Sequence, residues 1–174
     1  FPAGVNVSFG GTPVAPAEAG PVSIDSLGQH GSLTLLGGEL NVGTGGVQLD
    51  LFSQSGGVLS SAGDVAIGRF EQSGGSASVA GDFSTTTAYN QAGNGTLAVG
   101  GQTTLRSTDG ALLLGNLHSG GTLTVDSRDG PIRQHAGTTL SAAGTTLLSA
   151  SHGGAPADNT LNGAGTACVG SVSA

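Results

Sequence analysis

Four glutamines are the first residues whose spacing suggests shared chemistry. Gln54, Gln72 and Gln91 stand 18 and 19 residues apart. Gln134 continues the series when Leu114 is counted as the position between. If the chain stacks with this period, the side-chain amides share one angular position, where amides can donate and accept hydrogen bonds along the stack. We therefore expect a structural amide ladder, with a row of amides that reads sugar hydroxyls as the alternative.

Two aspartates, Asp64 and Asp82, each follow a glycine at the same point of the period. In register, their carboxylates would lie about one strand spacing (~4.8 Å) apart and would repel each other unless they face solvent or share a cation. Calcium is the natural candidate for that cation. The Gly-Gly-x-Gly-x-Asp rhythm of calcium-binding β-rolls is missing. We therefore expect no cofactor and each carboxylate capping its own turn, with calcium at Asp64 and Asp82 as the alternative.

Three aromatic residues precede three of the glutamines by two positions: Phe52, Phe70 and Tyr89. Residues two apart on a strand point to the same face. In a chain with few large apolar residues, this pattern predicts a buried aromatic stack at the centre of the core. Outward-facing rings would instead form a stripe on which sugars could stack.

Residues that could form a catalytic centre are scattered. No Gly-x-Ser-x-Gly motif marks a nucleophile, and the histidines lack the short spacing of a zinc site; they are His30, His118, His135 and His152. A polysaccharide lyase or hydrolase on a β-helix is the enzyme alternative. Glycosidases need two carboxylates across a sugar-sized cleft, and only Asp126 and Asp129 flank one turn. We expect no enzyme activity.

The glutamines, aromatic residues and aspartates discussed above lie at fixed positions of a sequence repeat. An aromatic residue, a glutamine two positions later and a Gly-Gly pair occur at 52–57 and at 70–75, and in altered form at 89–94. Asp-Gly turns at 109–110 and 129–130 keep a similar phase. Short alternating stretches separated by glycines are typical of strands, and no apolar pattern of helical period persists. The sequence predicts an all-β fold, a right-handed parallel β-helix with coils of about 20 residues.

The domain boundary follows from proline. Residues 1–21 carry four prolines, too many for a strand inside a ladder, and we expect an irregular, proline-rich cap or arm there. The parallel β-helix is expected at 22–174. With 34 glycines, 3% aromatic residues and neither Met nor Trp, its core must be a thin column of Leu, Val, Ile and Phe. At about 20 residues per coil, the whole chain would make roughly eight or nine coils.

The net charge restricts the classes of binding partner that the chain is expected to have. The formal net charge is −7, from 11 acidic residues and four basic ones, all arginine, so nucleic-acid binding is not expected. There is no apolar run long enough to cross a bilayer, and we expect no membrane insertion. The single cysteine, Cys168, cannot form an intrachain disulfide.

Three segments carry a resemblance. They read GPIRQHAGTTL at 130–140, AGTTLLSA at 143–150 and DNTLNGAG at 158–165. These segments resemble the internal repeats of filamentous-haemagglutinin-like adhesins and autotransporter passengers. The resemblance implies a right-handed parallel β-helix that is secreted by a Gram-negative bacterium, lies outside the cell or on its surface, and serves adhesion or biofilm.

The expected function is thus a non-catalytic structural or adhesive segment of a bacterial surface fibre, with host or matrix glycans or proteins as partners. The alternative is a self-assembling extracellular filament subunit. The end coils of a β-helix expose unpaired backbone groups, so that copies could stack end to end. The stretch 166–174 has neither proline nor charge to blunt such an edge.

Overall fold

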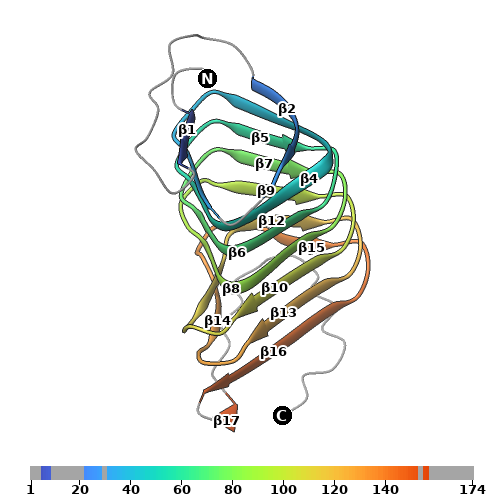
Figure 1. Cartoon of the computed structure of the whole chain (residues 1–174). Helices are drawn as coiled ribbons and strands as arrows, with labels where there is room; N and C mark the ends of the chain where they lie inside the picture. The colour runs from blue at the N-terminus through green and yellow to red at the C-terminus, as the bar shows by residue number, and fades with distance from the viewer. Residues whose placement is uncertain (1–4, 9–21, 29–30, 153–154, 157–174) are drawn as a thin grey trace.

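The computed structural model describes residues 5–8, 22–28, 31–152 and 155–156, and the side chains of 23–28 and 31–150. All regular elements in this part of the chain are β-strands. They stack as a solenoid of about six turns, with coils about 20 residues apart (Figure 1). The predicted all-β parallel β-helix is therefore confirmed. The expectation of eight or nine coils concerned the whole chain, and 157–174 lies outside the described residues.

Three columns of parallel strands form the sides of the rod, and we name them faces A, B and C. Face A consists of β5 (Val58–Ser61), β7 (Ser76–Val79), β9 (Thr96–Val99), β12 (Asn116–Ser119), β15 (Leu140–Ala142) and the starts of β2 (Val22–Leu27) and β4 (Glu39–Gln54). Face B consists of the middle of β4, the starts of β6 (Val65–Gln72) and β8 (Phe83–Gln91), and β10 (Thr103–Ser107), β13 (Leu123–Ser127) and β16 (Thr146–His152). Face C consists of β3 (Ser32–Leu35), the ends of β4, β6 and β8, and β11 (Leu112–Leu114) and β14 (Ile132–Gln134).

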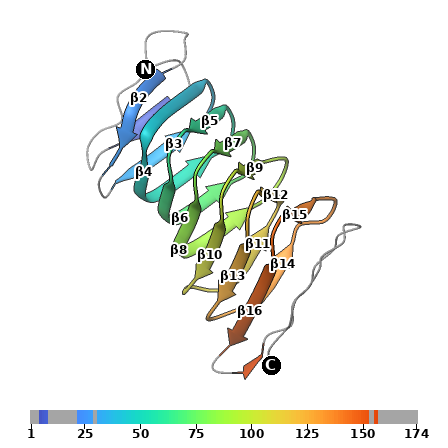
Figure 2. The ribbon, with the colours of Figure 1, turned by 90° about the vertical axis from the view of Figure 1, so that its right-hand side faces the viewer.

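The coil is right-handed. In Figure 1 the strands of face A lie behind and run to the right, while those of face B lie in front and run to the left. The chain meanwhile descends from its N-terminal to its C-terminal coils, and the view in Figure 2 agrees on which column is in front. This hand is the one that parallel strand connections within one sheet favour.

Alternation of buried and accessible residues places the core inside the rod. On nearly every strand the residues alternate between buried and accessible, as in β7 and β9, because successive side chains of a strand point to opposite faces. The inward residues form one column from Leu27 to Leu148. Parallel pairing keeps like beside like: Phe52 lies beside Phe70, and Phe70 beside Tyr89.

The Gly-Gly turns between faces C and A have a backbone cause. Gly57 has φ of 72°, a left-handed conformation that glycine adopts without steric cost. A Cβ atom there would lie 2.6 Å from the carbonyl oxygen of Gly38 in the preceding coil. Gly75 repeats both features one coil later, with φ of 76° and the carbonyl oxygen of Gly57 at 2.6 Å. Close stacking of turns therefore requires glycine here.

Two short strands run against the parallel order. β1 (Val5–Ser8) pairs antiparallel with β3, so that Val5 lies opposite Leu35. β17 (Ala155–Pro156) pairs antiparallel with the end of β16. Of the predicted cap at 1–21, only 5–8 lies within the described residues, and it covers the N-terminal edge of face C. None of the described elements is a helix that could span a membrane.

Candidate functional site

Three of the four predicted ladder glutamines are joined amide to amide inside the core. Gln72 donates from Nε2 to Oε1 of Gln54 at 2.9 Å, and Gln91 donates from Nε2 to Oε1 of Gln72 at 2.8 Å. All three side chains are buried. At the lower end, Oε1 of Gln91 accepts from the hydroxyl of Tyr89 at 2.6 Å and from the backbone N–H of Gly115 at 3.2 Å. The structure thus satisfies the buried amides within the core.

The same amides brace one corner of the rod. Each donates a second hydrogen bond from the end of face C to the start of face A in the next coil; the acceptors are the carbonyl oxygens of Ser76 for Gln54, Thr96 for Gln72 and Asn116 for Gln91. Gln54 and Gln91 also donate to carbonyl oxygens of their own turns, at Gly57 and Gly95. The ladder therefore stabilises both the turn and the stacking of coils.

Gln134 does not belong to this ladder. It shares the angular position, but Leu114 occupies the coil between it and Gln91. Its Nε2 donates to the carbonyl oxygen of Thr138 in its own turn, at 2.8 Å. The prediction of a four-membered ladder is corrected to three members, because a leucine in the intervening coil can neither donate nor accept.

The predicted aromatic residues form a stack in the core. Phe52 and Phe70 lie 5.6 Å apart between ring centroids and Phe70 and Tyr89 lie 5.2 Å apart, both pairs nearly parallel. Phe83 packs edge-on against Phe70 at 5.3 Å and was not singled out from the sequence. The sequence does contain an indication that Phe83 is buried: it follows Asp82 just as the apolar Val65 follows Asp64 one repeat earlier. Burial raises the pKa of the Tyr89 phenol, which keeps it a hydrogen-bond donor.

The two aspartates cap the turn of the next coil and not their own. Oδ1 of Asp64 accepts from the backbone N–H of Asp82 at 2.9 Å, and Oδ1 of Asp82 accepts from the backbone N–H of Gln102 at 2.7 Å. The prediction of own-turn caps is corrected accordingly. Within the described residues, no three His, Cys, Asp or Glu side chains lie close enough to share a metal ion.

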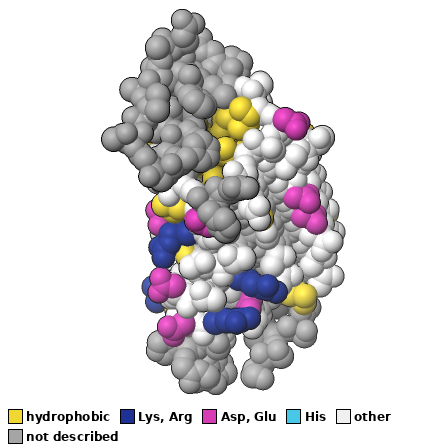
Figure 3. Space-filling view, in the orientation of Figure 1, with side chains coloured by type: hydrophobic (Ala, Val, Ile, Leu, Met, Phe, Trp, Pro, Cys, Tyr) yellow, Lys and Arg dark blue, Asp and Glu magenta, His cyan; other side chains and the backbone are white. Residues whose placement is uncertain are grey.

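Charged groups lie on the outside of the rod. Arg69 bridges Glu71 at 3.5 Å and Asp109, two coils further on, at 3.1 Å. Figure 3 shows basic and acidic side chains close together on the face in view, toward the C-terminal coils. Such exposed pairs contribute little to stability. His118 contacts the hydroxyl of Ser141 at 2.9 Å, while the predicted positions His30 and Cys168 lie outside the described residues, as does the side chain of His152.

Face A presents rows of short side chains outward. Parallel register aligns one row along the rod, at about 4.8 Å per coil; it consists of Asn41, Ser60, Ser78, Ala98, His118 and Ser141. A second row consists of Glu39, Val58, Ser76, Thr96 and Asn116. Most of these side chains are small and polar, and they form a repetitive surface without deep relief.

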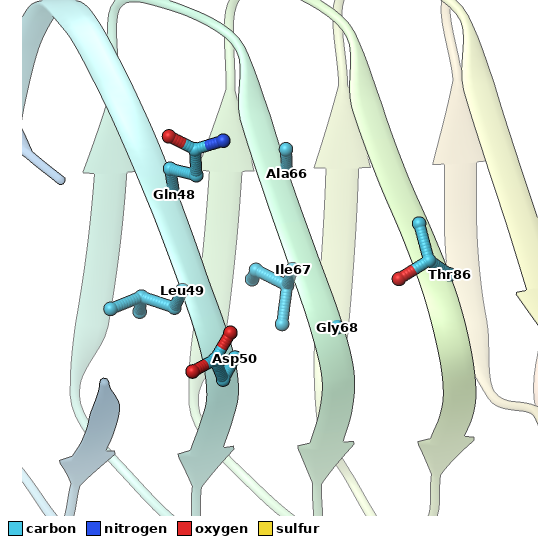
Figure 4. A pocket seen from close by; sticks show the side chains of 7 residues that line it. All are labelled: Gln48, Leu49, Asp50, Ala66, Ile67, Gly68 and Thr86. Atoms are coloured by element: carbon cyan, nitrogen blue, oxygen red, sulfur yellow. The ribbon is translucent and has the colours of Figure 1, made fainter. Parts of the chain in front are cut away.

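Shallow hollows interrupt the sides of the described part of the rod, and two of them lie on faces C and B. One of about 240 Å³ lies on face C beside Ser53, Glu71 and Asn90, over the amides of Gln54 and Gln72. The other, of about 160 Å³, lies on face B, and its lining is shown in Figure 4. In the first hollow Glu71 is paired with Arg69, and the amides below it bond within the ladder.

Comparison with known proteins returned no matching family model, no matching curated protein and no matching solved structure.

Proposed function

We propose that this chain is a non-catalytic structural and adhesive segment of a secreted fibre on the surface of a Gram-negative bacterium. The observation that carries the proposal is the repetitive outward surface of face A, where register aligns small polar side chains into rows. Such a surface suits many weak contacts spread along an extended partner, such as a host or matrix glycan or protein. Location outside the cell rests on the resemblance of the repeats to adhesins.

The hydrogen bonds made by the buried glutamines and by the two turn aspartates support this proposal. The glutamine amides bond to each other and to turn carbonyls, and Asp64 and Asp82 hold backbone N–H groups. These groups stabilise a long rod, which is what a spacer that displays a surface requires. The proposal therefore assigns stability to the inward side chains and recognition to the outward ones, and it requires no cofactor.

The test is a binding screen of the purified chain against immobilised glycans and matrix proteins. We expect saturable binding that Ser78→Glu on face A weakens and that Ser149→Glu on face B leaves unchanged. Both serines are exposed strand residues, so the pair separates an effect of place from an effect of charge. Binding of no partner at all would refute the adhesive part. Release of reducing or unsaturated sugar ends from acidic glycans would refute the non-catalytic part and favour the lyase or hydrolase.

A filament subunit remains the second hypothesis. Head-to-tail stacking would continue the parallel columns, and at face C the next copy would have to displace β1, which already pairs with β3. Electron microscopy of the purified chain distinguishes the two. Unbranched fibres would favour the subunit, and a monomer that stays single at high concentration would contradict it.

A further inference from the structure

The second hollow lies where the outward side chains of face B are smallest. In register, Gln48 of β4 lies beside Ala66 of β6, and Ser84 of β8 follows on the other side. Two residues further along β6, Gly68 lies between β4 and β8 with no side chain at all. A strip of β6 is therefore recessed below its two neighbours.

Polar groups surround this recess on both sides. Figure 4 shows the amide of Gln48 and the carboxylate of Asp50 along the β4 side, the hydroxyl of Thr86 on the β8 side, and Ala66 and Gly68 between them. Three kinds of hydrogen-bonding group thus border an apolar floor. All three side chains on the rim are exposed, so a ligand can reach them from solvent.

Only part of this recess has a backbone cause. A Cβ atom on Gly68 would lie 2.6 Å from the carbonyl oxygen of Asp50, so close stacking at the bend between faces B and C requires glycine. Ala66 is under no such constraint. Its side chain is exposed in the middle of a strand, where a larger residue would fit the fold. The small residue at 66 keeps the hollow open.

We propose that this hollow is a subsite for one neutral sugar ring of a glycan chain, which names the partner class for the proposed function and rests on that function. A pyranose presents a C–H face and a rim of hydroxyls, which match an apolar floor bordered by a carboxylate, an amide and a hydroxyl. The volume of about 160 Å³ is well below the roughly 300 Å³ and more of pockets that enclose whole small ligands. The formal net charge of −7 disfavours anionic sugars.

The test is an NMR titration of the full chain with neutral tetrasaccharides of glucose, galactose and mannose. We expect at least one of them to shift the resonances of Ala66 and Thr86, with a dissociation constant on the order of 1 mM for so few contacts. Ala66→Gln fills the hollow and should weaken binding about tenfold or more. Ala111→Gln, at an exposed alanine just before β11 of face C, should leave binding unchanged.

A second pair of variants tests the rim. Thr86→Val removes the hydroxyl at nearly constant volume and should weaken binding about threefold to tenfold, the loss expected for one hydrogen bond. Thr124→Val, two coils away on face B, is its control. Circular dichroism of all four variants shows that each one folds.

The outcomes separate this inference from the proposed function. Shifts confined to face A, or equal effects of Ala66→Gln and Ala111→Gln, overturn the subsite and leave an adhesive role standing. Binding only to matrix proteins, or only to anionic glycans, does the same. If the chain binds no glycan and no protein, both proposals fall.

Discussion

Replacing Gln72 by leucine removes the central rung of the amide ladder without changing the shape of the core. Leucine fits this column, because Leu35 and Leu114 occupy the equivalent position in other coils. The substitution takes the donor from the buried Oε1 of Gln54 and from the half-buried carbonyl oxygen of Thr96. The change in the free energy of unfolding therefore reports mainly the loss of these hydrogen bonds.

The magnitude follows from the groups left unsatisfied. A buried acceptor without a donor costs about 1–3 kcal/mol, and Oε1 of Gln54 is such an acceptor. The carbonyl oxygen of Thr96 can take a water molecule and adds less. Nε2 of Gln91 loses one acceptor but keeps the carbonyl oxygens of Gly95 and Asn116. Leucine regains about 1 kcal/mol of apolar transfer energy, so the free energy of unfolding should fall by about 2 kcal/mol.

The assay is urea unfolding followed by far-ultraviolet circular dichroism, with the slope m compared between variants. Gln134→Leu is the matched control, since its one amide bond runs to its own turn, and it should cost about 1 kcal/mol or less. The double variant Gln54→Leu/Gln72→Leu removes both partners and should cost about 1 kcal/mol less than the sum of the single variants. Equal costs for Gln72→Leu and Gln134→Leu, together with additivity, would refute a coupled ladder.

Three further substitutions probe the stack and the carboxylates. Phe70→Ala should lower the free energy of unfolding by about 3–5 kcal/mol, because its ring is fully buried between two others; a cost near zero in urea unfolding would place it on the surface. Tyr89→Phe should cost about 1 kcal/mol, since Gln91 keeps a second donor. The raised pKa of Tyr89 means that the folded state holds its proton longer, so stability should fall as pH rises above about 10, and Tyr89→Phe should reduce that slope in a pH series. Asp82→Ala should cost up to about 1 kcal/mol through the lost bond to Gln102, and EDTA or millimolar calcium should leave the thermal midpoint of the unchanged chain where it is.

Period and alternation were enough to predict the solenoid. Recurrence of an aromatic residue and a glutamine two positions apart placed Phe70 and Gln72 on one inward face, and parallel stacking then made each of them the neighbour of its copy in the next coil. The result depends on one property of the fold. A residue that recurs once per coil lies beside its own copy in the neighbouring coil. Features of this kind can be read directly from the sequence.

Contacts between different sequence positions could not be predicted in this way. The capping of Gln102 by Asp82 depends on where one turn lies relative to the next, and the repeat pattern does not specify that position. Phe83 meets Phe70 across the core from another face. The hollow on face B arises from Ala66 lying between longer neighbours, a relation that exists only once three strands are in register.

The end of the ladder at Leu114 has its own physical reason, found in the length of the corner that follows. From Gln54 to Leu59 the chain advances five positions between the inward residues that flank the corner, and from Gln91 to Leu97 six, whereas from Leu114 to Leu117 it advances three. A wide turn leaves carbonyl oxygens over the core that need a donor, and the glutamine amide supplies it. At the short corner leucine occupies this position, and Asn116 braces the corner by accepting the N–H of Thr139 in the next coil at 3.0 Å. Leu35 shows that corner length is not the only cause, because it precedes a five-position corner at the start of the ladder, where its neighbour on the other side is Val5 of β1.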